Sequence, residues 1–196
     1  MPEIAEEKVR YYFGGANGSG KSTLVSRIVK QKQEFIPFKG ATELMEALGI
    51  PGDYDKLRAM DHSVTTAAFG KLVQEQSKKH RNLIIDAHYM NLKHGKFYPV
   101  WGDWLSSVDA LVLVEAPASA ILERIELDPS KDRALFPAGA TEKQKLSLLK
   151  ALISTSKDVF LDCANQYNKK SLIIENTDPT KALDKFIKFD FNLPKT

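Results

Sequence analysis

The sequence is poor in the features that let a chain fold or localise by special means. Cys163 is the single cysteine among 196 residues, so an internal disulfide and a cysteine-built zinc site are both excluded. The longest purely apolar run spans five residues, 110–114, which is too short for a membrane-spanning helix. Residues 1–10 carry three Glu and no apolar core, unlike a secretory signal. These absences favour a cytoplasmic protein with no membrane partner.

Neither sign of charge dominates the chain. Its 28 Lys and Arg residues stand against 25 Asp and Glu, for a net charge of +3, and so even a balance predicts no nucleic-acid partner. Arginine is scarce, with six residues among the 28 basic ones. Because a planar guanidinium suits phosphate, each of the six is a candidate ligand. They are Arg10, Arg27, Arg58, Arg81, Arg124 and Arg133.

Strand-like and helix-like segments alternate along the whole chain. Short apolar runs that alternate with helices are typical of a parallel sheet covered on both faces. We therefore predict one α/β domain over residues 1–196, with three layers and about five strands, which binds its ligands at the carboxyl ends of the strands. The expected strands are 9–15, 35–38, 83–86, 110–114 and 172–174. The expected helices are 22–32, 42–48, 55–79, one from Pro117, one from a capping box at Thr141, and 179–189.

A glycine-rich motif lies between the first predicted strand and the first predicted helix. It fits the pattern G-x-x-x-x-G-K-[ST], which is typical of a phosphate-binding loop in this setting. Glycines let successive backbone N–H groups turn toward a phosphate, and the helix N-terminus attracts the same anion. The expected ATP-binding residues are Gly15, Ala16, Asn17, Gly18, Ser19, Gly20, Lys21, Ser22 and Thr23. The alternative is a glycine-rich turn that only caps a helix.

Two oxygen ligands for Mg²⁺ follow from the same motif. The Ser22 hydroxyl is expected to bind the ion beside the phosphates, with Lys21 on the β- and γ-phosphates. Asp86 ends the apolar run 83–85 and would place its carboxylate at the same edge of the sheet. The alternative for Asp86 is a turn or helix-capping role.

Five further blocks resemble the archaeal-type adenylate kinases, in order and at the right spacing around the loop. They are Phe38-Lys-Gly40-Ala-Thr-Glu-Leu44, Asp53-Tyr-Asp55-Lys-Leu57-Arg58, Asp86-Ala-His88, Pro99-Val-Trp101 with Asp109, and Asp128-Pro-Ser-Lys131-Asp-Arg133. The resemblance covers the chain from its first strand to its last helix. The chain departs from the family pattern at Tyr54, Ala87, Lys131 and Ala134.

The resemblance implies a P-loop kinase that phosphorylates a nucleoside monophosphate, most of all AMP. Region 35–80 would bind the acceptor, with Arg58 on its phosphate and His88 in the substrate site. Arg124 and Arg133 would act in catalysis beside a short lid, 128–139, because planar donors answer the charge on a transferring phosphoryl group. The resemblance also allows a homotrimer.

The residues leave two other functions open. One is a P-loop kinase for another small metabolite, since the loop also resembles that of the zeta-toxin-like kinases. The other is an ATP-binding regulatory or assembly factor with slow hydrolysis. The structural alternative to a role in the site is a surface salt bridge for Arg124 and Arg133, and an exposed helix arginine for Arg58.

Overall fold

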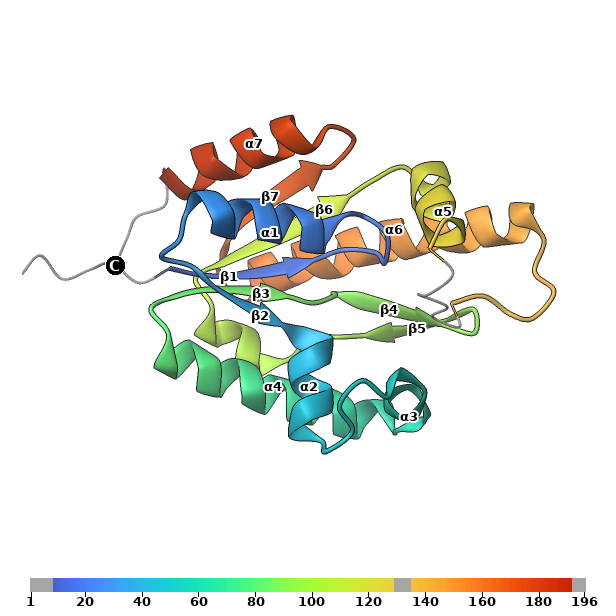
Figure 1. Ribbon diagram of the computed structural model, residues 1–196, viewed down its shortest axis with the longest axis horizontal. Coiled ribbons are helices and arrows are strands. Elements are labelled where there is room, and N and C mark those ends of the chain that lie inside the picture. The colour runs from blue at the N-terminus through green and yellow to red at the C-terminus, as the bar shows by residue number, and fades with distance from the viewer. Residues whose placement is uncertain (1–8, 129–134, 192–196) are drawn as a thin grey trace, which may run out of the picture.

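A five-stranded parallel sheet forms the centre of the computed structural model, which describes residues 9–128 and 135–191 (Figure 1). The strands lie in the order β2 (Ile36–Lys39), β3 (Asn82–Asp86), β1 (Val9–Gly14), β6 (Ala110–Glu115) and β7 (Lys170–Glu175). All four pairings are parallel. The prediction of an α/β fold with about five parallel strands is therefore confirmed.

Helices cover both faces of this sheet, as the alternating pattern predicts (Figure 1). They are α1 (Lys21–Gln31), α2 (Gly40–Ala47), α3 (Tyr54–Ala59), α4 (His62–Lys79), the 3₁₀ helix η1 (Asp103–Ser107), α5 (Ala118–Glu126), α6 (Glu142–Gln166) and α7 (Pro179–Phe191). The capping box expected at Thr141 is present and begins α6. Within the described part of the chain, no helix combines the length and apolar composition that a membrane span requires.

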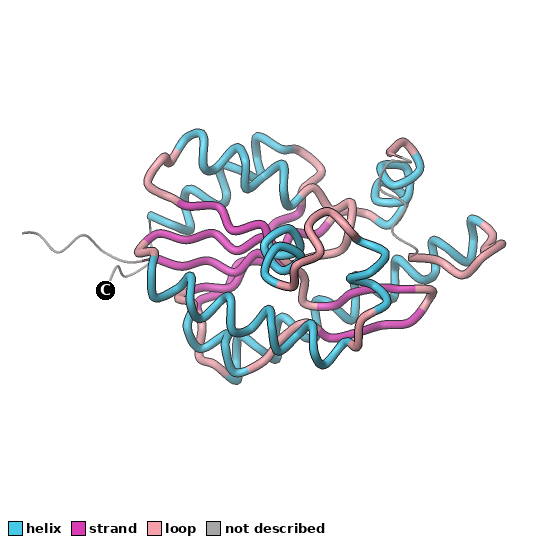
Figure 2. The backbone as a smooth tube through the Cα atoms, turned by 60° about the horizontal axis from the view of Figure 1, so that its bottom comes forward, coloured by secondary structure: helices cyan, strands magenta, loops and turns pink. Residues whose placement is uncertain are grey.

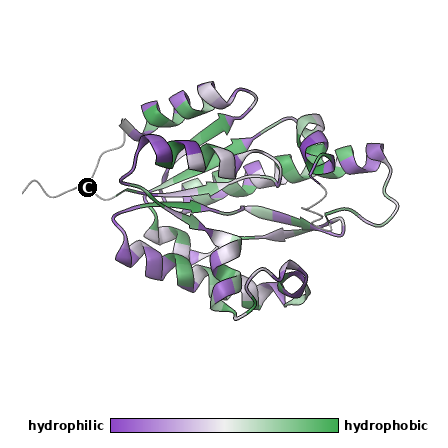
Figure 3. Ribbon diagram, in the orientation of Figure 1, coloured by the Kyte–Doolittle hydropathy of each residue, from purple (hydrophilic) through white to green (hydrophobic). Residues whose placement is uncertain are grey.

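Side chains of β1 alternate between two halves of the core. Tyr11 and Phe13 pack toward α1 and α7, where Phe186 is fully buried, and Tyr12 packs toward α4 and α6. Each such side chain contributes roughly 1.5–3 kcal/mol when fully buried. Apolar residues accordingly concentrate on the strands and on the inner sides of the helices (Figure 3). Because β1 is buried on both faces, its position is fixed, and so is the start of the glycine-rich loop that follows it.

The structure corrects two sequence-based expectations. Residues 55–79 do not form one helix, because the Asp61 side chain accepts from Ser63 N and Val64 N and so begins a new helix, α4. A separate hairpin of β4 (Met90–Lys93) and β5 (Lys96–Pro99) was not expected at all (Figure 2). It carries buried Met90 and Leu92 on short strands with mixed composition, too short for a clear period-two signal.

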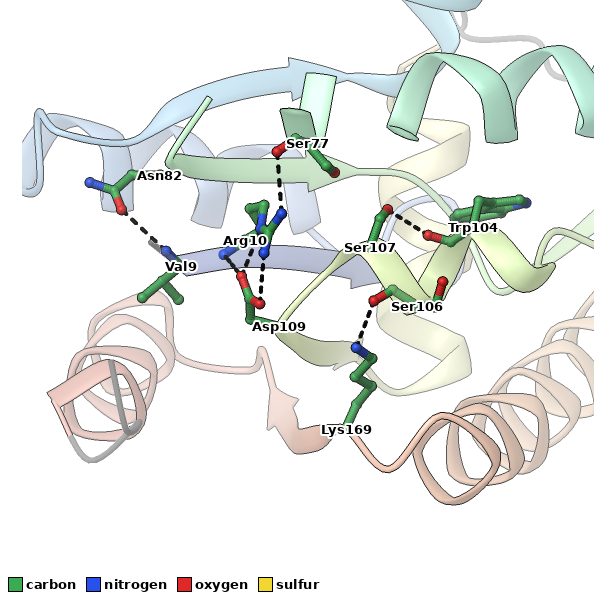
Figure 4. Close-up of polar contacts among 9 residues, drawn as sticks. All are labelled: Val9, Arg10, Ser77, Asn82, Trp104, Ser106, Ser107, Asp109 and Lys169. Atoms are coloured by element: carbon green, nitrogen blue, oxygen red, sulfur yellow. Dashed lines mark hydrogen bonds and ion pairs between the residues drawn. The ribbon is translucent and has the colours of Figure 1, made fainter. Parts of the chain in front are cut away.

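The amino ends of the strands are joined by a polar cluster (Figure 4). Arg10 on β1 pairs with Asp109, which precedes β6, through two nitrogens at 2.8 and 3.0 Å. A third nitrogen of Arg10 donates to the Ser77 carbonyl at the end of α4. On the other side of β1, the Tyr11 hydroxyl and the Lys32 ammonium both bind the buried carboxylate of Asp190 on α7. Arg10, one of the six candidate phosphate ligands, is therefore paired with Asp109 at the amino edge of the sheet.

Candidate active site

The glycine-rich loop lies at the carboxyl end of β1, between two neighbouring strands. Gly15 has a φ of +146°, and a Cβ there would lie 2.2 Å from the Val114 carbonyl oxygen on β6. Gly20 has a φ of +85° and is the residue before the first turn of α1. Side chains rarely adopt these backbone conformations, so the glycines permit the loop to run close to the sheet. The loop and the start of α1 thus meet at the edge where the fold predicts a ligand site.

Lys21 folds back over this loop. Its ammonium donates to the carbonyl oxygens of Gly15 and Ala16 at 3.0 and 3.1 Å, and its side chain is buried. The two residues that follow it, Ser22 and Thr23, are exposed in the first turn of α1. The structure therefore groups the lysine, the two hydroxyls and the helix N-terminus as the sequence predicts.

The register of the sheet places Asp86 near the start of the loop. It ends β3 and pairs with Phe13, which lies two residues before Gly15 on the adjacent strand. Asp86 and Ser22 offer a carboxylate and a hydroxyl oxygen, the hard donors that Mg²⁺ accepts. The described residues contain no group of three or more His, Cys, Asp or Glu that could hold a metal. Mg²⁺ commonly keeps water and phosphate ligands beside one or two protein oxygens, so this donor set fits that ion.

His88 contacts the loop directly. Its Nδ1 lies 2.8 Å from the Gly15 carbonyl oxygen, and because a carbonyl only accepts, Nδ1 carries the proton in this contact. The His88 backbone carbonyl in turn accepts from the Tyr12 hydroxyl at 2.6 Å. Burial raises the pKa of Tyr12 well above its usual range, so this hydroxyl stays a donor. The sequence placed His88 in the site, and the structure gives it a contact with the first glycine of the loop.

Arg124 also reaches the loop, from the last turn of α5. Its Nη1 donates to the Gly18 carbonyl at 3.0 Å and its Nη2 to the Asn176 carbonyl at 3.4 Å. This guanidinium is exposed, yet it joins the loop to the segment that follows β7. The structure therefore brings Arg124 to the phosphate loop, and its part in catalysis stays a prediction.

Sequence reasoning missed one residue at this edge. Asn176 follows β7 directly, is 5% exposed, and donates from Nδ2 to the Ser19 carbonyl at 2.9 Å. Its position after a predicted strand was a usable signal, because polar residues at carboxyl ends of parallel strands face the ligand edge. Its contact with residue 19 joins chain segments 157 residues apart, which no local pattern predicts.

The two remaining predicted site arginines are placed differently. Arg58 on α3 is half-buried and pairs with Asp55 one turn earlier, at 3.0 Å. Its role as acceptor ligand stays a prediction. Arg133 lies outside the described residues, as do all of residues 129–134 of the predicted lid. The end of that lid packs on the hairpin, where Leu135 is buried and its carbonyl accepts from Gly95 N at 2.9 Å.

A family model described as an AAA domain matches residues 14–136, which include the glycine-rich loop, Asp86, His88 and Arg124. No curated protein matches the chain. Among solved structures, the chain is similar to a shikimate kinase from Bacteroides thetaiotaomicron. The two share 12% identity and a TM-score of 0.64, over 93% of this chain and 98% of that one.

Two more solved structures show the same likeness. A shikimate kinase from Acinetobacter baumannii, in complex with shikimate, gives a TM-score of 0.67 at 12% identity, over 94% and 93% of the two chains. A deoxyadenosine kinase from M.mycoides, with the products dCMP and dCDP, gives 0.60 at 12% identity, over 94% and 100%. Identities this low concern the fold alone, and that fold is the P-loop kinase fold.

Proposed function

The chain belongs to the AAA domain family, and from that premise we propose that it is a phosphotransferase acting on a nucleoside monophosphate. AMP is the first candidate acceptor, in the reaction ATP + AMP ⇌ 2 ADP. The observation that carries this proposal is the loop 15–20 with Lys21, at the carboxyl edge of a parallel sheet. The ordered resemblance to the archaeal-type adenylate kinases supports the choice of acceptor.

The roles of the loop residues follow from phosphate chemistry. The backbone N–H groups of 15–20 and the N-terminus of α1 bind the phosphates of ATP. Lys21 exchanges the Gly15 and Ala16 carbonyls for oxygens of the β- and γ-phosphates. Mg²⁺, when bound, neutralises charge on these phosphates, and Ser22 and Asp86 are the residues that would hold it.

The acceptor is held by residues outside the loop. Arg58 binds its phosphate, since an arginine fork matches phosphate oxygens in pairs. His88 keeps the first glycine of the loop in place beside the acceptor. Arg124 and Arg133 are assigned to the charge that spreads over the transferring phosphoryl group.

A second candidate is a kinase for another small metabolite. The shikimate kinases and the deoxyadenosine kinase share the fold and act on acceptors that are not nucleoside monophosphates, as their names state. The departure from the family pattern at Tyr54 falls in the acceptor region 35–80, and the one at Ala87 precedes His88; both favour this second candidate. A regulatory factor with slow ATP hydrolysis is the third candidate.

One assay separates the three. Purified protein with Mg·ATP is offered AMP, the other nucleoside monophosphates, deoxynucleosides and shikimate, and ADP formation is followed through a coupled oxidation of NADH. Rapid ADP formation with AMP alone supports the first proposal. Turnover with another nucleoside monophosphate keeps the first proposal and changes only its acceptor base. Turnover only with a deoxynucleoside or shikimate supports the second, and slow hydrolysis that no acceptor changes supports the third. Light scattering on the same preparation tests the trimer that the resemblance allows.

A further inference from the structure

We propose that Asn176 is a positioning residue of the phosphate loop, which acts on nucleotide binding through the peptide between Ser19 and Gly20. The inference rests on the proposed function only in that the loop must bind a nucleotide. It assigns no contact between Asn176 and the substrate.

The contact is a buried hydrogen bond of ordinary length, and the sheet holds the backbone of the donor residue. The Asn176 amide nitrogen lies 2.9 Å from the Ser19 carbonyl oxygen, and Ser19 is fully buried. Because that carbonyl only accepts, the amide must present Nδ2 to it. The backbone of Asn176 is tied to the sheet, since its N–H donates to the Glu115 carbonyl at 2.7 Å. The amide is therefore a fixed donor at the end of β7 and β6.

This donor sets the orientation of one peptide plane. The C=O and N–H groups of a trans peptide lie in one plane and point in opposite directions. With the Ser19 carbonyl held toward Asn176, the Gly20 N–H points away from it. Within the described part of the chain, that N–H has no hydrogen-bond acceptor. A backbone donor at the start of α1, with no acceptor in the protein, is available to a phosphate oxygen.

Gly20 packs closely against the Asn176 amide. A Cβ at Gly20 would lie 2.3 Å from the Asn176 Nδ2, and its φ of +85° is itself a conformation that side chains rarely adopt. On the other side of the amide, Oδ1 is buried and has no partner among the described residues. The only hydrogen bond that this buried side chain makes in the described structure is thus the one to Ser19. An apolar side chain of the same shape would avoid the unpaired oxygen, so the amide's contribution lies in Nδ2.

Two other side chains also donate to carbonyls of this loop, although the N–H of the Gly18–Ser19 peptide already donates to the Ala16 carbonyl at 3.2 Å. His88 holds the Gly15 carbonyl and Arg124 holds the Gly18 carbonyl. Arg124 also donates to the Asn176 carbonyl, so the anchors of Gly18 and Ser19 are connected. Among these three anchors, Asn176 is the buried one, and its replacement by Leu changes neither the charge nor a titratable group of the site.

The test compares two substitutions with a matched control. Asn176→Leu removes the donor and keeps the size, and Asn176→Asp replaces the donor with an acceptor that repels the Ser19 carbonyl. The control is Asn82→Leu, because Asn82 also binds a backbone group, Val9 N at 3.3 Å, but at the opposite edge of the sheet. For each protein we measure the melting temperature, the dissociation constant of a non-hydrolysable ATP analogue by calorimetry, and the KM of the acceptor at saturating ATP.

We expect Asn176→Leu to weaken binding of the analogue about tenfold, the scale of one lost hydrogen bond. Asn176→Asp should weaken it further because of its negative charge, and the acceptor KM should change less than about twofold in both. Asn82→Leu should lower the melting temperature without changing the dissociation constant. A folded Asn176 variant that binds the analogue as wild type does, with only its melting temperature reduced, would overturn the inference. If the Leu variant does not fold, the isosteric Asp variant decides by the same criterion. Failure of the wild-type protein to bind the analogue would instead overturn the proposed function.

Discussion

At the amino edge of the sheet, charged side chains bind one another, whereas at the carboxyl edge side chains bind the backbone. Arg10 forms a salt bridge with Asp109, and the buried carboxylate of Asp190 accepts from Lys32 and Tyr11. At the other edge, His88 and Asn176 donate to carbonyls of the glycine-rich loop. The first arrangement satisfies its groups within the protein and so contributes to stability. The second leaves backbone N–H groups on the far side of each peptide, where a phosphate can bind them.

The largest effect on activity is expected from the carboxyl edge. Lys21→Ala should lower kcat by about 10²–10³, because the transferring phosphoryl group loses a positioned cation. The matched control, Lys30→Ala, removes the same side chain from the other end of α1, where Lys30 is exposed. Steady-state kinetics and circular dichroism measure the two variants. Near-normal turnover in a folded Lys21→Ala protein would show that the loop is not the catalytic phosphate site.

At the amino edge, substitutions should lower the free energy of unfolding and leave kcat unchanged. Asp190→Ala leaves the Tyr11 hydroxyl and the Lys32 ammonium without their carboxylate, which should lower the free energy of unfolding by about 3 kcal/mol. Urea denaturation measures this, with the exposed Asp184→Ala on the same helix as control. The kcat of folded Asp190→Ala should equal that of wild type. A large loss of kcat there would contradict the division between a stabilising and a functional edge.

Substitution of Arg58 tests whether region 35–80 binds the acceptor beside the carboxyl edge of the sheet. Arg58→Ala should raise the KM of the acceptor by roughly 10- to 150-fold, since a charged hydrogen bond contributes about 1.5–3 kcal/mol. The KM of ATP should change much less. Arg81→Ala is the control, because Arg81 is an exposed arginine beside the amino end of β3. Equal changes in the KM of the acceptor and the KM of ATP would show that Arg58 does not bind the acceptor.

The smallest effect is expected at the half-exposed pair of the amino edge. Arg10→Ala should lower the free energy of unfolding by about 1–2 kcal/mol. The loss is smaller than for Asp190→Ala because the side chains of Arg10 and Asp109 are both partly exposed to water. A double-mutant cycle with Asp109→Ala isolates the pair. A coupling near zero would show that backbone contacts alone hold this edge together.

Much of the fold could be predicted from local patterns. The five strands of the main sheet are short, apolar and bounded by glycine or polar residues, and all five were found close to their observed ends. The glycine-rich loop was recognisable because each of its residue types has a local reason. The hairpin from Met90 to Pro99 was not predicted, because its turn at His94 and Gly95 and its mixed strands become stable only by packing against α6 and the segment from Leu135.

The candidate site divides in the same way. Local sequence determined the phosphate loop, the lysine, the start of α1 and the carboxylate that ends β3, because each depends on neighbours along the chain. Only the tertiary structure decided that Arg10 belongs to a structural pair, and that Arg124 and Asn176 hold loop carbonyls. These contacts join segments 99, 106 and 157 residues apart. Chain segments so distant meet only because the parallel sheet brings the ends of its strands to common edges.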